Sequence, residues 1–169
     1  VHQGLITNKG AKMSKSKGNV VRPDSFVNAH GSDVFRMYLM FMGPFEAGGD
    51  WSDLGITGVV RFVKRMHRAI LEKVDVKRED PGTRSLEGIG TGQDKSTVTA
   101  ALHKTIKKVT EDIEGLRFNT AISALMEFLN LIEKAESLSP GLCKTVALLL
   151  APLAPHLAAW AKVQIDGAL

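Results

Sequence analysis

Residues 98–116, VTAALHKTIKKVTEDIEGL, indicate how most of this chain folds. Apolar side chains return there at alternating spacings of four and three residues, at Val98, Leu102, Ile106, Val109, Ile113 and Leu116. In an α-helix this spacing gathers the apolar residues on one side, as on a helix packed inside a bundle. The stretch therefore predicts an amphipathic helix whose apolar side is buried against neighbouring helices.

Further helices are predicted after this one. Asn119 is a suitable N-cap for a second helix, whose apolar residues again have helical spacing. Ser139, followed by a proline, provides the cap and the first-turn residue of a third helix. Two prolines then interrupt the chain, and we expect a last short helix to run through Trp160, with His156 packed or hydrogen-bonded at its start.

The N-terminal side is also predicted to be helical from Pro23 onward. Pro23 suits a first helical turn, and Ser32 is a suitable cap for a second short helix. Ser52 is a suitable N-cap for a longer amphipathic helix that reaches about Val74, after a loop over residues 45–50. Residues 1–9 have the pattern of a strand end followed by a turn. The expected fold class is all-α, an up-and-down helical bundle preceded by a short strand and loop.

Changes in composition divide the chain into four segments. Residues 1–31 hold the strand end and a polar loop, and residues 32–75 hold the helices that begin the bundle. Residues 76–94 are rich in glycine and charge and have few side chains to bury, so we expect a flexible connection there. Residues 95–169 are expected to supply the remaining helices of the bundle.

Residues 11–21, AKMSKSKGNVV, carry the chemistry of a phosphate-binding loop. From Lys12 to Arg22 the chain has four basic residues and no acidic one, and two serines add hydroxyl donors. Gly18 permits a tight turn whose backbone N–H groups can also donate. Such a loop suits a polyanion, and the alternative interpretation is a solvated basic loop without a ligand.

The overall composition excludes several classes of protein. The 169 residues are 44% hydrophobic and 24% charged, unlike disordered or collagen-like chains, and the net charge of +4 permits nucleic-acid binding. One cysteine cannot form an internal disulfide, and no signal peptide or membrane-spanning run is evident, so we expect a cytoplasmic protein without a membrane partner. The histidines lack the spacing of metal ligands, so no metal site is predicted.

The polar loop resembles a signature of the class I aminoacyl-tRNA synthetases. It contains the KMSKS motif of that family, in the residues Lys12, Met13, Ser14, Lys15 and Ser16. The continuation from Lys17 through Gly18 and Asn19 to Val21, and residues 31–44, GSDVFRMYLMFMGP, resemble the leucyl members. Residues 102–110, 117–122 and 150–156 are similar to the helical bundle of the bacterial leucyl enzymes. The resemblance spans nearly the whole chain, which looks like a C-terminal fragment of such an enzyme.

This resemblance implies an activity and a set of site residues. Leucyl members join leucine to tRNA(Leu) as monomers, using ATP with Mg²⁺ and releasing AMP and pyrophosphate. Lys12 and Lys15 would be the catalytic residues that contact the phosphates. The implied ATP-binding loop comprises Lys12, Met13, Ser14, Lys15, Ser16, Lys17, Gly18 and Asn19. Because the family's other ATP-binding signature, the HIGH motif, is absent from the chain, the fragment is expected to be inactive alone.

The predicted bundle resembles the anticodon-binding domain of the same family, which implies contact with tRNA(Leu). The candidate phosphate contacts are basic residues of two helices, namely Arg61, Lys64, Arg65, Arg68, Lys104, Lys107 and Lys108. Glu111, Asp112 and Glu114 follow the second group closely, so part of that surface is expected to be charge-balanced. A solvated helix surface is the alternative interpretation for the first group.

Other functions stay open at this point. One is the same region of a valyl, isoleucyl or methionyl enzyme, against which Lys17 and residues 40–44 argue. Another is a stand-alone tRNA- or RNA-binding helical module that derives from a class I synthetase and activates no amino acid. The residues after His156 depart from the pattern of the family, so the resemblance does not extend to how the last helix packs.

Overall fold

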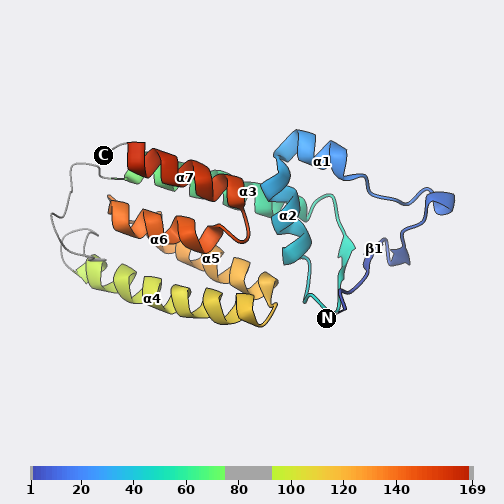
Figure 1. Cartoon of the computed structure of the whole chain (residues 1–169), viewed down its shortest axis with the longest axis horizontal. Helices are drawn as coiled ribbons and strands as arrows, with labels where there is room; N and C mark the ends of the chain where they lie inside the picture. Colours follow the sequence, from blue (N-terminus) through green and yellow to red (C-terminus); the bar gives the residue numbers. More distant parts are fainter. Residues whose placement is uncertain (1, 75–92, 168–169) are drawn as a thin grey trace.

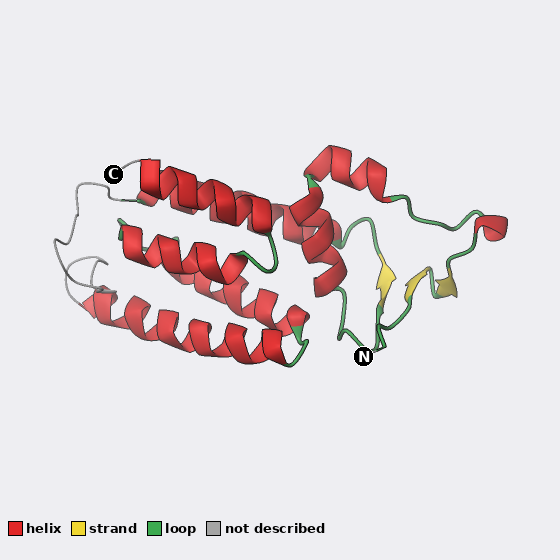
Figure 2. Ribbon diagram, in the orientation of Figure 1, coloured by secondary structure: helices red, strands yellow, loops and turns green. Residues whose placement is uncertain are grey.

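A computed structural model of the chain describes residues 2–74 and 93–167. Figure 1 and Figure 2 show a mostly helical molecule with a few short strands at one end. Along the chain the elements are β1 (Ile6–Asn8), β2 (Ala11–Lys12), the 3₁₀ turn η1 (Lys15–Lys17), α1 (Pro23–His30), α2 (Ser32–Phe41), β3 (Gly49–Trp51), α3 (Ile56–Lys73), α4 (Gln93–Glu114), α5 (Phe118–Ile132), α6 (Pro140–Leu150) and α7 (Pro155–Gly167).

The predicted helical bundle is confirmed. Helices α4 to α7 lie lengthwise beside one another, with α3 behind α7, and the strands and the polar loop lie beyond α2 at the opposite end from the C-terminus (Figure 1). Helix α4 packs on α5, and α6 packs on α7. Residues 76–92 of the expected connection lie outside the described residues, and α4 already begins at Gln93.

The buried side of α4 differs from the predicted one in three positions. Val98, Leu102 and Val109 are buried as expected, but Ile106 and Ile113 are only half-buried, and the half-buried Leu116 lies beyond the end of the helix at Glu114. Thr105 and Asp112 occupy the fully covered positions instead, at 8% and 1% exposure. Both polar side chains have partners, since the Thr105 hydroxyl donates to the Ala101 carbonyl at 2.8 Å and Asp112 pairs with basic residues. A spacing of four and three fits both sets of positions, so the pattern could not distinguish them.

Several predicted helix boundaries were wrong by a few residues. Helix α3 begins at Ile56, because Ser52 accepts the Gly55 N–H at 3.2 Å in a separate turn that precedes the helix. Asn119 lies inside the first turn of α5, and the residue before that helix is Arg117. Helix α7 continues well past Trp160.

Other predicted boundaries are confirmed. The Ser139 hydroxyl accepts the Leu142 N–H at 3.2 Å, with Pro140 as the first residue of α6. Pro23 is the first residue of α1. The predicted cap at Ser32 was wrong, because Ser32 is the first residue of α2, Gly31 precedes the helix, and no side-chain hydrogen bond caps it.

Strand β3 begins within the segment that the sequence predicts as a loop. The small sheet has the strand order β2-β1-β3, in which β1 pairs with β2 antiparallel and with β3 parallel. Lys9 and Gly10 join β1 to β2 with φ values of 55° and 71°, which is the two-residue hairpin turn that matches the twist of the strands. Thr7 lies opposite Lys12 on one side and opposite Asp50 on the other.

An aromatic cluster joins the sheet to the helices. Trp51 is 6% exposed, and its ring meets the rings of Phe26 and Tyr38 edge-on at 4.7 and 5.1 Å. The Tyr38 hydroxyl donates to the Ser52 carbonyl at 2.9 Å and accepts the Ser52 N–H at 3.1 Å, and burial raises the pKa of Tyr38. These contacts fix β3 against α2, so the sheet is attached to the bundle through α2.

Two further features of the fold bear on function. In the part of the chain that the structure describes, no helix is both long and apolar enough to cross a membrane. Cys143 is buried in α6, and this burial raises the pKa of its thiol to about 12. A thiol with that pKa is protonated near neutral pH, which excludes Cys143 as a nucleophile.

Candidate functional site

The predicted phosphate loop lies between β2 and α1, at the end of the molecule farthest from the C-terminus (Figure 1). Lys15–Lys17 form the single 3₁₀ turn η1, which Gly18 ends with a φ of 65°. The Gly18 N–H donates to the Lys15 carbonyl at 3.2 Å. Gly18 therefore has the tight-turn role that the sequence predicted, because a left-handed residue is needed there.

Asn19 closes the loop on itself. Its Oδ1 accepts the Ser14 N–H at 2.8 Å, and its Nδ2 donates to the Lys12 carbonyl at 3.2 Å. The Asn8 side chain in turn donates to the Asn19 carbonyl at 2.9 Å, which ties the loop to β1. The Asn19 amide is thus engaged with the loop itself, and its predicted contact with ATP stays a prediction.

The loop presents its cations to solvent. Lys12, Lys15 and Lys17 are all exposed, and no acidic side chain within the described ranges forms an ion pair with any of them. The hydroxyl oxygens of Ser14 and Ser16 lie 2.7 Å apart. Met13 is half-buried and packs against the core, so it anchors the loop. The arrangement can receive an anion such as a triphosphate, because the charges are unpaired and lie on one short loop.

Asp50 lies near this loop and is not among the site residues that the sequence predicts. Its Oδ1 accepts the Thr7 hydroxyl at 2.6 Å and the Gly10 N–H at 2.9 Å. Those two hydrogen bonds lower the pKa of Asp50. The parallel pairing of β1 with β3 brings Asp50 close to Thr7 and Gly10, which lie at least 40 positions away in the sequence. No local sequence pattern predicts that pairing.

The basic residues of α3 divide into two groups. Arg65 donates from Nε to Glu133 Oε1 at 3.0 Å and from Nη2 to Asn130 Oδ1 at 2.6 Å, and Nη2 also meets Glu133 Oε2. This contact with Glu133 raises the pKa of Arg65, and contact with Arg65 lowers the pKa of Glu133. Arg65 is thus engaged with Glu133 and Asn130, and its predicted phosphate contact stays a prediction. Exposed side chains without an ion pair in the described ranges are those of Arg61, Lys64 and Arg68.

The lysines of α4 line a groove between α4 and α5. Its volume is about 740 Å³, and Phe128 and Leu131 contribute apolar surface to it. Lys108 Nζ lies 2.7 Å from Asp112 Oδ2, although outside hydrogen-bond geometry, and Lys107 lies 3.8 Å from Glu111. The expected charge balance on this face is confirmed for those two lysines. Lys104 has no ion pair within the described residues.

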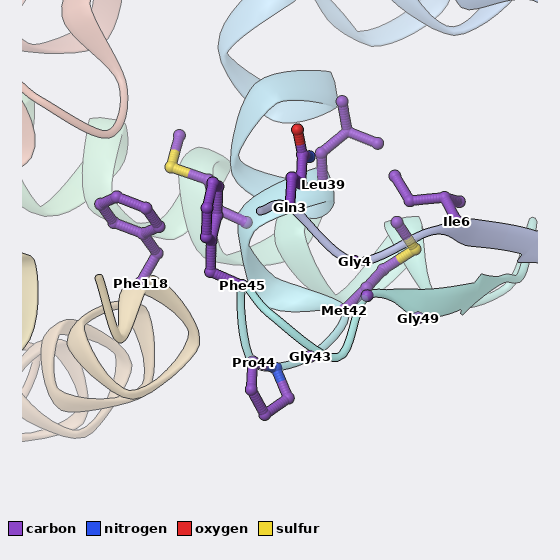
Figure 3. Close-up of a pocket in the computed structure, with 12 residues that line it drawn as sticks. Gln3, Gly4, Ile6, Leu39, Met42, Gly43, Pro44, Phe45, Gly49 and Phe118 are labelled. Carbon is purple, nitrogen blue, oxygen red and sulfur yellow. The ribbon is translucent and has the colours of Figure 1, made fainter. Parts of the chain in front are cut away.

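A small cavity lies where the sheet meets the start of α5. Its volume is about 80 Å³, and Figure 3 shows Phe45 and Phe118 beside each other at its edge. Their rings are in edge-on contact, with centroids 6.0 Å apart. No titratable side chain lines the cavity. The cavity is therefore a gap in the packing between the sheet and α5, and its lining has none of the titratable groups that catalysis needs.

The structure does not bring all predicted site residues together. The loop lysines lie at one end of the molecule, and α4, which carries Lys104, Lys107 and Lys108, lies in the bundle (Figure 1). No group of three or more acidic, histidine or cysteine side chains in the described part of the chain is arranged to hold a metal ion. The two groups of cations are therefore two separate candidate sites for anionic ligands.

Two family models match different parts of the chain. Residues 1–50 match the class I tRNA synthetases of the isoleucyl, leucyl, methionyl and valyl group, and residues 96–162 match the anticodon-binding domain of tRNA ligase. The first match contains the phosphate loop and its hairpin, and the second covers most of helices α4 to α7. The first match also includes α1 and α2 and ends within β3, and α3 lies between the two matches.

Curated relatives and solved structures agree with these matches. A leucine–tRNA ligase of Dehalococcoides mccartyi is 43% identical over 98% of this chain and 20% of its own length. One from Sorangium cellulosum is 45% identical over 94% of this chain and 17% of its own length. The chain thus spans about a fifth of the length of the curated relatives that it matches.

The fold is similar to that of two synthetases of known structure. The LeuRS of Agrobacterium radiobacter K84 (agnB2), crystallised in a ternary complex with tRNA and LeuAMS, has a TM-score of 0.79 at 30% identity over 96% of this chain and 22% of that chain. Mycobacterium tuberculosis methionyl-tRNA synthetase has a TM-score of 0.71 at 21% identity over 95% of this chain and 36% of that chain, which shows the fold alone. From these matches and the loop and bundle described above, the chain belongs to the class I aminoacyl-tRNA synthetases, as a region of leucyl-tRNA synthetase that covers the end of the catalytic core and the anticodon-binding domain.

Proposed function

We propose that this region supplies the phosphate loop and a tRNA-contacting bundle to a monomeric enzyme that joins leucine to tRNA(Leu) in the cytoplasm. The substrates would be leucine, tRNA(Leu) and ATP with Mg²⁺, and the products leucyl-tRNA, AMP and pyrophosphate. The observation that supports this proposal best is the set of exposed loop lysines, Lys12, Lys15 and Lys17, which have no acidic partner in the described residues. The loop that carries them is held in shape by Asn19.

The loop cations would act on the first step, in which the leucine carboxylate attacks the α-phosphate of ATP. Negative charge then grows on the departing pyrophosphate. The ammonium groups of Lys12 and Lys15 stabilise that charge more than they stabilise bound ATP, and this difference raises the rate. Ser14, Ser16 and the turn at Gly18 shape the loop around them.

The bundle would hold the tRNA through its phosphate backbone. Arg61, Lys64, Arg68 and Lys104 are the exposed cations on α3 and α4 that form no ion pair in the described residues, and they suit this role best. Lys107 and Lys108 contribute less, since each already lies near a carboxylate. Contacts of this kind supply affinity that falls with salt and carry little sequence information.

The proposal is tested by Lys15→Ala in the full-length parent enzyme. The single-turnover rate of leucyl-adenylate formation should fall by about 100- to 1,000-fold. This corresponds to a loss of about 3–4 kcal/mol of transition-state stabilisation, the cost of removing one preorganised donor to a developing charge. Leucine affinity should be unchanged, because Lys15 lies on a loop that serves the phosphates. An unchanged adenylate rate in Lys15→Ala would contradict the proposal.

A further inference from the structure

The hairpin that begins the phosphate loop is held at two points by one oxygen atom. Asp50 Oδ1 accepts the Thr7 hydroxyl at 2.6 Å and the Gly10 N–H at 2.9 Å. Thr7 lies on β1, and Gly10 lies in the turn that leads into β2. Lys12, the first loop lysine, is the last residue of β2 and pairs with Thr7. Asp50 therefore fixes the place at which the loop leaves the sheet.

Beyond that point, the side-chain amides of Asn8 and Asn19 hold the rest of the loop by hydrogen bonds to its backbone. Asn8 holds the Asn19 carbonyl at 2.9 Å, and Asn19 holds the Lys12 carbonyl and the Ser14 N–H. The loop is thus closed by Asn19 and fastened at its base by Asn8. Without Asp50, β1 would keep its backbone pairing with β3 and the Thr7 hydroxyl its long contact with the Gly49 carbonyl at 3.4 Å, but the turn at Gly10 would lose its hydrogen bond to β3.

Asp50 is itself well anchored. It lies on β3 directly before Trp51, which is buried against Phe26 and Tyr38, and the Trp51 ring nitrogen donates to Asp53 Oδ1 at 2.7 Å. Tyr38 holds the next residue, Ser52, by two hydrogen bonds. The Asp50 backbone therefore belongs to the packed part of the molecule, while its carboxylate reaches the hairpin.

We propose that Asp50 is a positioning residue for the phosphate loop, and this inference rests on the proposed function of that loop. Its carboxylate holds the hairpin so that Lys12 and Lys15 lie at the correct distance from the departing pyrophosphate. In this role Asp50 acts through the hairpin, without a contact of its own to leucine, ATP or tRNA. Its loss acts on the geometry of the loop, and a misplacement of about 1 Å in a catalytic group can lower a rate on the order of 100-fold.

The effect of Asp50 is separable from a general loss of structure. Its side chain is exposed, so its removal opens no cavity in the core. Asp50→Asn keeps an oxygen that can accept both hydrogen bonds, whereas Asp50→Ala keeps neither. Glu46→Ala is a matched control, because Glu46 is an exposed acid on the loop before β3 with no hydrogen bond or ion pair to its side chain from the described residues.

The experiment measures single-turnover adenylate formation, leucine and ATP affinity, and thermal unfolding in the full-length parent enzyme. Asp50→Ala should lower the adenylate rate at least about tenfold, with leucine affinity and melting temperature unchanged. Asp50→Asn should restore most of the rate, and Glu46→Ala should behave as the wild type. Thr7→Val, which removes one of the two hydrogen bonds, should have an intermediate rate.

Two outcomes would overturn the inference. One is a wild-type adenylate rate in Asp50→Ala, and the other is a loss of melting temperature and leucine affinity in proportion to the rate. Lys15→Ala in the same assays separates this inference from the proposed function. If Lys15→Ala is slow and Asp50→Ala is normal, only the positioning role of Asp50 fails. If Lys15→Ala is normal, the loop function itself fails.

Discussion

The carboxylate of Asp33 on α2 lies 2.8 Å from Nδ1 of His156 in the first turn of α7, across 123 positions of sequence. Its second oxygen accepts the Leu157 N–H at 2.7 Å. The Asp33 side chain on α2 thus caps α7. Helix α7 begins at Pro155, and the alanine before that proline has no polar side chain to act as a cap. Together with Arg36, which donates to the Pro152 carbonyl at 3.1 Å, Asp33 joins the sheet end to the last helix of the bundle.

Removal of this cap should destabilise the whole chain. Asp33 is 8% exposed, so Asp33→Ala leaves the Leu157 N–H without its acceptor in a covered site. The free energy of unfolding in urea should fall by about 1–2 kcal/mol, the cost of losing a helix cap. Asp33→Asn keeps an acceptor oxygen and should lose less. Equal stability of Asp33→Ala and the wild type would show that α7 does not depend on this contact.

Acid should weaken the bundle through Asp112. Burial alone would raise the pKa of this carboxyl, but Lys108, Thr120 and Arg117 outweigh burial and lower it. Because the folded-state pKa lies below the unfolded value of about 3.9, the stabilisation is complete above that value and is lost as pH falls through the folded pKa. The difference in urea stability between wild type and Asp112→Asn should therefore be largest near pH 7 and shrink below about pH 4. Glu46→Gln should track the wild type, and a constant difference for Asp112→Asn across the range would refute this assignment.

The basic residues of α3 should differ in their effect on tRNA binding. Arg61→Ala should weaken binding of tRNA by the full-length enzyme and lower the slope of log affinity against log salt by about 1, as expected for one lost phosphate contact. Arg65→Ala should leave that slope unchanged and lower bundle stability instead, because Arg65 pairs with Glu133 and Asn130. Filter-binding titrations over a salt series measure the slope for both variants. The reverse ranking would show that Arg65 leaves Glu133 when tRNA binds.

Two glycines should respond in opposite ways to alanine. Gly48 has a φ of 74°, and an added Cβ would lie 2.1 Å from the Leu5 carbonyl oxygen, so Gly48→Ala should destabilise the chain by about 1–3 kcal/mol. Gly58 lies inside α3 with open space around its Cβ position, so Gly58→Ala should stabilise it by about 1 kcal/mol. Denaturant unfolding of both variants tests the pair. A stabilised Gly48→Ala would mean that the close approach of Leu5 to residue 48 is not needed.

The sequence was most informative where structure is local. The loop over residues 12–19, Pro23 at the start of α1 and the Ser139-Pro140 cap of α6 each depend on residues close together in the chain, and each lies where it was expected. Helix existence was also predictable, since apolar periodicity extends over many residues. The starting residues of helices were harder to predict, because a serine such as Ser52 can cap a separate turn as well as a helix.

The remaining features depend on contacts between distant residues. Asp112 was expected on charge-balanced surface, but Arg117 and Lys108 allow it to take a covered position on α4. Strand β3 pairs with β1 in parallel, and no composition signal links residues 49–51 to residues 6–8. Arg65 could not be separated from Arg61 and Arg68, because Glu133, its partner, is 68 positions away on another helix.

The amide of Asn19 has a consequence for how the phosphate loop can move. Its two ends hold the Lys12 carbonyl and the Ser14 N–H, so the segment from Lys12 to Asn19 forms a closed ring of chain with one entrance and one exit side by side. Because Lys12 also belongs to β2 and pairs with Thr7, this ring is attached to the sheet at its first residue. Asn19 therefore sets how far the rest of the ring, with Lys15, can move away from Lys12, and a substitution at Asn19 would remove that limit.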